Sequence, residues 1–305
     1  MIKEFYSHGK LLITGEYAVL DGAKSLALPT RYGQKLKVTT IEAPMIHWRS
    51  LDVDGAVWFE TTFQLEALKK PSEQFRDCGE VEQTLVKLLR AARKLNPEFL
   101  QNEQGFEVET ELEFPRNWGL GSSSTLINNL AQWAQVDAFQ LLWNGFSGSG
   151  YDIACAQNNG PLIYQVLQKQ PVIEKIAFHP PFYKNLFFVY LDKKQNSREG
   201  IARYRSVIDQ KDQLLSAVNE ITRALLKTQS LADFEALLNH HEELISKTIQ
   251  LPMVKSELFK NYSGSVKSLG AWGGDFVLVT GNEESPTYFK EKGYTTIIPY
   301  QQMIL

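Results

Sequence analysis

Hydrophobic and polar residues follow two different periods along the first half of the chain. Single-residue alternation over 34–41 and 106–114 predicts half-exposed strands, and the aromatic and threonine-rich segments 46–48 and 56–63 predict two more. Residues 80–95 instead carry apolar side chains at helical spacing, with basic residues toward the end, as a helix prefers. The first half is therefore expected to mix strands and helices.

A second unit is expected after the two prolines of 179–182, which interrupt both helices and sheet ladders. The continuous apolar run 186–191 predicts a buried strand, followed by long helices. The helices expected are 201–227 and 231–248, and the last strands are 277–280 and 295–299. The fold class expected is α+β with two lobes, residues 1–182 and 183–305.

One segment of the first lobe, Pro115 to Thr125, combines glycines, a row of hydroxyls and an abrupt switch into an apolar-periodic run. This pattern is typical of a loop that leads into the N-terminus of a helix. Free backbone N–H groups and the helix dipole favour an anion there, and hydroxyls can bind phosphate or Mg²⁺. A glycine turn followed by a serine helix cap is the alternative.

Three other segments carry glycines beside reactive residues: 7–22 with Lys10, 148–154 with Asp152, and 267–280 before a β-branched strand. In this order the four segments resemble the signature motifs of the GHMP kinases, a superfamily of small-molecule kinases. The resemblance covers the whole chain. It implies a ribosomal-protein-like N-terminal lobe and a ferredoxin-like C-terminal lobe, with ATP and substrate between them.

The resemblance also assigns cofactors and the residues that bind them. It implies ATP and Mg²⁺ as cofactors, with Ser123 as the residue that contacts the metal. The nucleotide-binding residues implied are Gly119, Leu120, Gly121, Ser122, Ser123 and Ser124 in the second motif, and Gly270, Ala271, Gly273 and Gly274 in the last. The order of importance among the serines stays open at this point.

Asp152 and Lys10 are the catalytic residues that the resemblance implies. Asp152 follows Gly148-Ser-Gly150, where the backbone can approach a substrate, and it would act as the general base. Lys10 matches a lysine that lies beside this aspartate in the mevalonate branch, where it would steady the transferred phosphate. The alternatives are a helix N-cap for Asp152 and a solvated lysine for Lys10.

On the substrate side, Glu16 and Tyr17 stand where mevalonate kinases usually carry Glu-His. The Glu-Tyr and Gly-Gly-Asp patterns of this chain are closer to phosphomevalonate kinases. Ser197 and Arg198, in a polar segment with Lys193 and Lys194, are candidates for an acceptor-phosphate anchor, with a solvated loop as the alternative.

Two departures from the family pattern concern metal binding and the last motif. The family usually carries a Mg²⁺-binding glutamate after the phosphate loop, but no glutamate occurs between Glu113 and Glu174. Trp272 replaces a glycine of the last motif, which puts in doubt how closely that loop can wrap a site.

Composition narrows the function classes. A net charge of −3 gives no indication of binding to nucleic acid or to an anionic membrane, since both favour basic proteins. Two cysteines are too few for a disulfide framework. No apolar segment reaches membrane-span length, so a cytoplasmic protein with a small-molecule substrate is expected, and a homodimer is left open.

The function predicted is an ATP-dependent kinase that phosphorylates mevalonate or phosphomevalonate. Two alternatives stand beside it. One is a kinase of the same fold that acts on a sugar or an amino-acid alcohol. The other is a nucleotide-binding sensor with little turnover.

Overall fold

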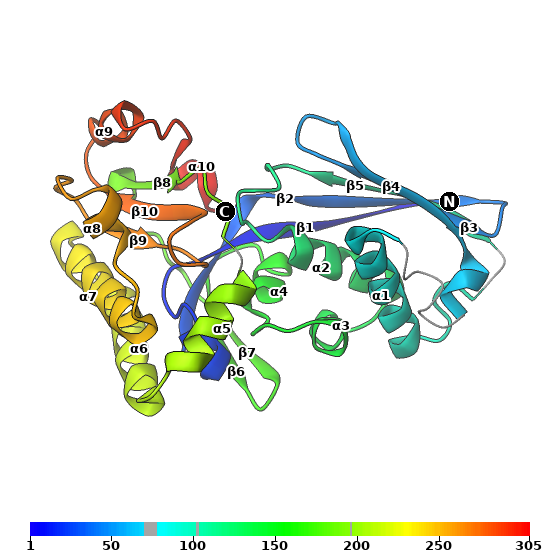
Figure 1. Cartoon of the computed structure of the whole chain (residues 1–305), viewed down its shortest axis with the longest axis horizontal. Coiled ribbons are helices and arrows are strands. Elements are labelled where there is room, and N and C mark those ends of the chain that lie inside the picture. Colours follow the sequence, from blue (N-terminus) through cyan, green and yellow to red (C-terminus); the bar gives the residue numbers. More distant parts are fainter. Residues whose placement is uncertain (70–77, 102–103, 196) are drawn as a thin grey trace. The chain divides into compact units, whose positions relative to one another are not determined.

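The computed structural model describes residues 1–69, 78–101, 104–195 and 197–305, which form two compact units (Figure 1). Unit 1 comprises Met1–Gly9, Tyr32–Arg116 and Gly121–Gln157, and unit 2 comprises Lys10–Arg31, Asn117–Leu120 and Asn158–Leu305. The division does not follow the predicted boundary after residue 182. The chain passes from one unit to the other several times, so each unit is built from segments that are distant in sequence.

Unit 1 is a sheet with helices packed beside it. Strands follow the order β4-β3-β5-β2, with β1 also paired to β2; β3 and β5 run parallel, while β3 pairs with β4, and β2 with β5, in antiparallel fashion. The strands are β1 (Ile2–Leu12), β2 (Ser25–Ile41), β3 (Met45–Leu51), β4 (Val57–Gln64) and β5 (Gly105–Leu112); β1 and β2 extend into unit 2. The helices are the 3-10 helix η2 (Leu65–Lys69), α1 (Glu80–Leu95), α2 (Ser122–Ala134), α3 (Ala138–Gly145) and α4 (Tyr151–Ala156).

The predicted helix 80–95 is confirmed as α1. Its buried side chains are Leu85, Val86, Leu88, Leu89 and Ala92, which follow the helical period, and acidic and basic residues occupy its first and last turns. The four predicted strands of the first half also correspond to observed strands, since 34–41 is the last part of β2.

Unit 2 contains a four-stranded antiparallel sheet of order β11-β8-β10-β9. Its strands are β8 (Leu186–Tyr190), β9 (Val266–Ser268), β10 (Phe276–Thr280) and β11 (Ile297–Pro299). Helices connect β8 to β9 and β10 to β11, so the element order is the βαββαβ of the ferredoxin-like motif. Every residue of β8 and β10 is buried, as their continuous apolar runs predict.

The remaining elements of unit 2 are helices and a hairpin. The helices are η1 (Ala18–Asp21), η4 (Tyr183–Asn185), α5 (Ser197–Val207), α6 (Lys211–Leu225), α7 (Leu231–Ile249), α8 (Val254–Leu258), α9 (Ser285–Glu291) and α10 (Tyr300–Met303). The hairpin strands β6 (Leu162–Leu167) and β7 (Gln170–Lys175) join unit 2 because β6 pairs with the first residues of β2.

The prediction of one helix over 201–227 is wrong, because α5 ends at Val207 and α6 begins at Lys211. Each helix is held by a different contact with the first motif region. Tyr204 of α5 donates a hydrogen bond to Asp21, while Asn219 of α6 accepts one from the backbone of Lys24. The spacing of apolar residues does not predict this break, because the contacts that hold the two helices are with residues far away in sequence.

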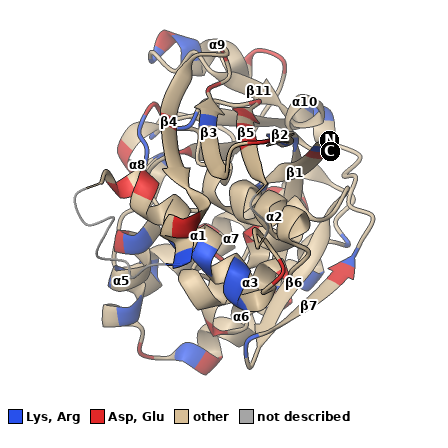
Figure 2. Ribbon diagram, turned by 90° about the vertical axis from the view of Figure 1, so that its right-hand side faces the viewer, with Lys and Arg blue, Asp and Glu red and all other residues tan. Residues whose placement is uncertain are grey.

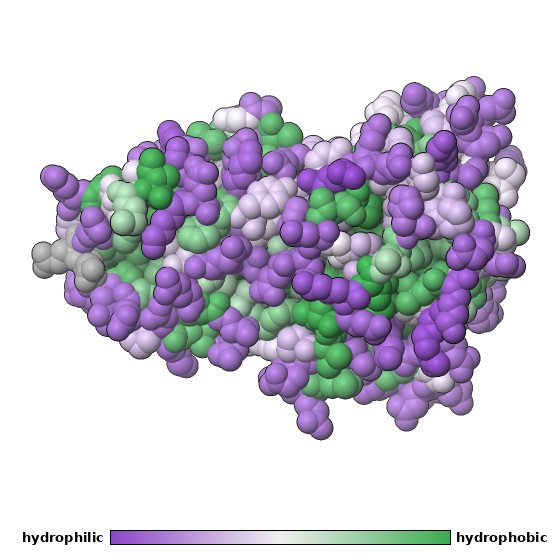
Figure 3. All heavy atoms as spheres, turned by 180° about the vertical axis from the view of Figure 1, so that it is seen from behind, coloured by the Kyte–Doolittle hydropathy of each residue, from purple (hydrophilic) through white to green (hydrophobic). Residues whose placement is uncertain are grey.

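The surface is mixed in charge and polarity. Basic and acidic residues are spread over many helices, strands and loops instead of gathering on one element (Figure 2). On the face in Figure 3, hydrophobic residues form small groups among hydrophilic ones. None of the helices in the described ranges combines the length and hydropathy that a membrane span requires.

Candidate active site

In unit 1, the second motif forms the start of helix α2. Gly121 takes the N-cap position in the left-handed region, with φ of 93°, and no side chain caps the helix. The serine-cap alternative is therefore wrong: the helix begins at Ser122, and its first backbone N–H groups have no side-chain acceptor. Such a terminus suits an anion, because the helix dipole adds to the free donors.

The serines of this turn, which could not be ranked from sequence, differ in their surroundings. Ser124 is buried and its hydroxyl donates to the Gly121 carbonyl at 2.8 Å, while Thr125 is buried and bonds to the Gln34 side chain at 2.7 Å. Ser123 is exposed and Ser122 is half-buried. The hydroxyls that a ligand can reach are therefore those of Ser122 and Ser123.

Asp152, also in unit 1, lies inside the first turn of α4. The helix begins at Tyr151 after Gly150, whose φ is 91°, so the alternative of an Asp152 N-cap is wrong by two positions. The carboxylate is half-buried and accepts a hydrogen bond from the backbone N–H of Ile153 at 3.1 Å. A carboxylate in this place can accept a hydrogen bond or a proton, as a general base must.

In unit 2, Lys10 lies against the first part of the second motif. Its ammonium donates to the Gly119 carbonyl at 2.6 Å, and its backbone N–H donates to the Leu120 carbonyl at 3.0 Å. A Cβ atom on Gly270 of the last motif would lie 4.0 Å from the same ammonium. Parts of three motifs that are far apart in sequence therefore lie together at Lys10 within this unit. These contacts argue against the alternative of a solvated lysine.

Sequence reasoning missed Asp275, which follows the last motif. A Cβ atom on Gly119 would lie 2.3 Å from Oδ2 of Asp275, so only glycine fits at position 119 beside this carboxylate. Burial raises the pKa of Asp275, and the ammonium groups of Lys10 and Lys194 oppose that rise. The Gly-Gly-Asp pattern was the available signal, but it was used only to compare branches of the family.

In the last motif, Gly270 and Gly273 are partly exposed, while Gly274 and the large Trp272 side chain are buried. Gly270 and Gly273 take the left-handed region with φ of 67° and 80°, while Ala271 is buried. The Trp272 side chain is 7% exposed and packs in a cluster of helix residues, with its indole N–H donating to the Pro252 carbonyl at 2.8 Å. Within unit 2 the tryptophan side chain is therefore directed into the helical core.

Glu16 belongs to a fully buried ionic network within unit 2. Its carboxylate accepts from the Lys267 ammonium at 2.6 Å, and the same ammonium lies 3.3 Å from Glu242 of α7. His241 of α7 accepts the Gly15 backbone N–H at 2.9 Å and lies 3.5 Å from the second oxygen of Glu16. The exposed fractions of Glu16, Lys267, Glu242 and His241 are 1%, 0%, 2% and 0%.

Burial decides the protonation of this network. Desolvation raises the pKa of Glu16 to about 7, although Lys267 opposes it, and desolvation holds the pKa of His241 well below its ordinary value. Burial alone would lower the pKa of Lys267, but the carboxylates of Glu16 and Glu242 raise it. One lysine thus faces two carboxylates, and Glu16 is the group that accepts a proton near neutral pH. Its predicted contact with substrate stays a prediction.

Of the other predicted substrate residues, Tyr17 is 7% exposed, while Ser197 and Arg198 are exposed at the start of α5. The segment before α5 contacts the last motif. The backbone N–H of Gln195 donates to Asp275 at 3.3 Å, and the Asp275 N–H donates to the Lys193 carbonyl at 2.7 Å. The structure therefore brings the polar segment 193–195 to the carboxylate that touches Gly119.

No group of three or more His, Cys, Asp or Glu residues that could hold a metal occurs in the described ranges. Mg²⁺ does not need such a cage, because it keeps several waters and is often held by one or two protein oxygens together with phosphates. The accessible hydroxyls of Ser122 and Ser123 fit that role.

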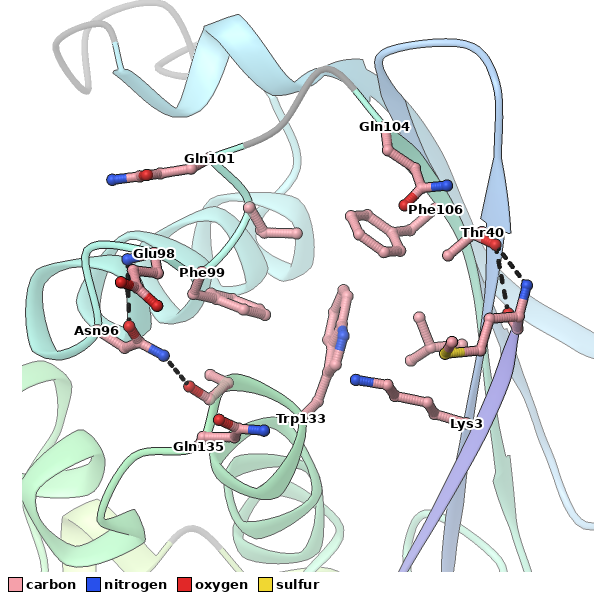
Figure 4. A pocket seen from close by; sticks show the side chains of 14 residues that line it. Lys3, Thr40, Asn96, Glu98, Phe99, Gln101, Gln104, Phe106, Trp133 and Gln135 are labelled. Atoms are coloured by element: carbon pink, nitrogen blue, oxygen red, sulfur yellow. Dashed lines mark hydrogen bonds between the residues drawn. The ribbon is translucent and has the colours of Figure 1, made fainter.

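A cavity of about 310 Å³ lies elsewhere in unit 1 and is lined by Phe99, Phe106 and Trp133 among others (Figure 4). The three rings meet edge to face, with centroids 4.9 and 5.4 Å apart. No predicted site residue lines it, so we do not include it in the candidate site.

A scan against protein-family models finds no match to the chain, and a search of curated protein sequences finds none either. Solved structures do match over nearly the whole chain. The Methanococcus jannaschii mevalonate kinase has a TM-score of 0.69 at 17% identity, covering 97% of this chain and 96% of that one. The Streptococcus pneumoniae phosphomevalonate kinase, solved with phosphomevalonate and AMPPNP, has a TM-score of 0.69 at 18% identity and 95% coverage of both chains.

A sugar kinase matches as well. The Lactococcus lactis galactokinase, solved with galactose, has a TM-score of 0.63 at 14% identity, covering 95% of this chain and 88% of that one. At these identities the likeness establishes the fold. This chain has the fold of the GHMP small-molecule kinases, as its motifs predicted.

Proposed function

We propose that this protein is an ATP-dependent kinase that transfers the γ-phosphoryl group to mevalonate or phosphomevalonate. The observation that carries the proposal is the placement of Lys10 on the Gly119 carbonyl, with the last motif beside it. A cation held on a phosphate loop is what phosphoryl transfer uses to stabilise the charge of the transferred group. The shared fold with kinases that act on these acceptors supports it.

The proposal gives each unit a part of the chemistry. In unit 1, the uncapped first turn of α2 would bind phosphate oxygens through backbone N–H groups, with Ser122 and Ser123 as further ligands. Mg²⁺, when bound, neutralises phosphate charge. Asp152 would accept the proton of an acceptor hydroxyl, as mevalonate offers, or orient the phosphate oxygen of phosphomevalonate. In unit 2, Lys10 would hold the transferred phosphate.

The choice of acceptor rests on motif details. The Glu-Tyr and Gly-Gly-Asp patterns favour phosphomevalonate, and the lysines of 193–194 supply cations that a phosphorylated acceptor needs. The match to galactokinase keeps a sugar acceptor in the experimental panel. The missing glutamate and Trp272 are the two features that favour the sensor alternative, and the Trp272 side chain packs in the core of unit 2 instead of filling the loop.

The test is ATP consumption across mevalonate, phosphomevalonate, homoserine and several sugars, with wild-type protein and Asp152→Asn. We expect the variant to lose about a hundredfold to ten-thousandfold in kcat while ATP affinity changes little, since a positioned base contributes this much. Asp137→Asn is the matched control, because Asp137 is an exposed carboxylate that caps α3 of the same unit. Near-wild-type turnover in a folded Asp152→Asn variant would remove the aspartate from the mechanism.

A further inference from the structure

Tyr17 of the first motif and Trp272 of the last motif contact each other. The backbone N–H of Trp272 donates to the Tyr17 hydroxyl at 3.0 Å, and both side chains are 7% exposed in one cluster. Tyr17 has φ of 60° and ψ of −46°, a backbone conformation that an aromatic residue adopts only under strain. The surrounding contacts must offset this strain, so the position of the Tyr17 ring is tightly specified.

The Tyr17 ring is also the surface on which helix α5 rests. A Cβ atom on Gly200 would lie 2.6 Å from the Tyr17 hydroxyl and 3.0 Å from its ring. One turn later, Tyr204 stacks on Tyr17 with ring centroids 5.8 Å apart and an interplanar angle of 20°. Gly200 is therefore required where the helix meets the hydroxyl, because any larger side chain would push α5 away from the first motif.

The two ends of α5 are fixed by motif residues as well. Toward the C-terminal end, Tyr204 and Arg205 donate to the Asp21 carboxylate at 2.7 Å each. Before the N-terminal end, Gln195 donates to Asp275, and a Cβ atom on Gly274 would lie 2.2 Å from the Gln195 side chain. Contacts with the first and last motifs thus fix the position of α5. They thereby also fix the position of Ser197 and Arg198, which are exposed at its start.

We propose that Tyr17, held by Trp272, is a positioning residue that fixes α5 and thereby determines which acceptor the kinase accepts. This inference rests on the proposed function and deepens it. Tyr17 does not touch the acceptor in this account. It acts through the placement of the polar residues 193–195 and 197–198, whose lysines, serine and arginine are suited to an acceptor that carries a phosphate.

The experiment combines Tyr17→Phe, Gly200→Ala and the double variant, with Tyr262→Phe as control. Tyr262 is a buried tyrosine of the same unit whose hydroxyl donates to the Thr280 carbonyl at 2.6 Å, in a different cluster. Tyr17→Phe removes one hydrogen bond. We therefore expect it to raise the KM of the phosphorylated acceptor about two- to tenfold and to leave the KM of ATP unchanged.

Gly200→Ala gives the sharper result because its effect depends on Tyr17. Alone, the added methyl group meets the hydroxyl and should raise the acceptor KM further. In the Tyr17→Phe background that oxygen is gone, so the double variant should have a lower acceptor KM than Gly200→Ala alone. Trp272→Phe should act in the same direction as Tyr17→Phe, since it loosens the packing that holds the ring.

Hydrogen exchange of α5 supplies a readout that does not depend on activity. Tyr17→Phe should speed exchange in peptides covering 197–207, and Tyr262→Phe should not. Unchanged exchange in α5, or faster exchange with an unchanged acceptor KM in an active enzyme, would overturn the proposal. A wild-type protein without kinase activity on any acceptor would overturn the proposed function and the specificity claim together, and exchange would still show whether Tyr17 holds α5.

Discussion

Replacing Glu16 with glutamine should change how the stability of the protein depends on pH. Glu16 is buried in a network with Lys267, Glu242 and His241, and His240 is the neighbour of His241 in sequence. Desolvation raises the pKa of Glu16 from 4.5 to about 7. In the folded protein Glu16 therefore holds a proton over a pH range in which the unfolded chain has released it. The stability that this proton binding contributes is complete below pH 4.5 and is lost as the pH rises through about 7.

The size of the effect follows from the two pKa values. A rise from 4.5 to about 7, at about 1.4 kcal/mol for each tenfold change in proton affinity, corresponds to roughly 3 kcal/mol. Glutamine keeps the shape of the side chain and cannot ionise. The difference in unfolding free energy between wild type and Glu16→Gln should therefore move in favour of the variant by up to this amount between pH 4.5 and 7.5.

Urea unfolding followed by tryptophan fluorescence at several pH values measures this difference. Comparing the two proteins at each pH removes the contribution of groups that titrate in both. Glu243→Gln is the matched control, because Glu243 is an exposed glutamate on α7, the helix that carries Glu242 and His241, and its replacement should leave the pH dependence as in wild type. A difference between wild type and Glu16→Gln that stays constant with pH would refute the assignment of the buried proton to Glu16.

Three further predictions concern the same network, the phosphate loop and the acceptor. Lys267→Met should lower the free energy of unfolding by about 3–5 kcal/mol in denaturant titrations, since it leaves buried carboxylates without a cation; a loss under 1 kcal/mol would contradict this. Gly121→Val should abolish ATP binding in calorimetry, whereas Gly55→Val, at a left-handed glycine with open space around it, should not. Arg198→Ala should raise the KM of phosphomevalonate about ten- to a hundredfold and leave mevalonate little changed, with the exposed Arg223→Ala as control. Equal effects on both acceptors would mean that Arg198 serves another role.

The fold could be predicted from the sequence because local patterns and motifs agreed. Helix α1 was found from its apolar period, and the fully buried strands β8 and β10 from continuous apolar runs. The break between α5 and α6 could not be predicted, since it depends on where Asp21 and Lys24 lie in space. The composition of the two units could not be predicted either. Each unit is made of three separate segments, and no change in amino-acid composition marks where the chain passes from one unit to the other.

For the candidate site, residue types could be predicted from the sequence, but the contacts and burial of these residues could not. The pattern at 122–125 did not show that Ser124 bonds to the Gly121 carbonyl while Ser123 is exposed. Glu16 was placed on the substrate side, although its partner Lys267 is 251 positions away, and no local rule links the two. From sequence, Trp272 looks like an obstacle at the loop. That its side chain points into the core could not be predicted, because this depends on contacts with Tyr17 and the helices, which are distant in sequence.

Transfer of radioactive phosphate from γ-labelled ATP to a small molecule tests the central claim most directly. Wild-type protein is incubated with labelled ATP and either mevalonate or phosphomevalonate, and the products are separated from nucleotide. The account predicts label in the phosphorylated acceptor, and loss of that label in Lys10→Met and Asp152→Asn variants that remain folded. ATP binding without label in either acceptor, in a homoserine or in any sugar of the panel would contradict the assignment of this protein as a small-molecule kinase.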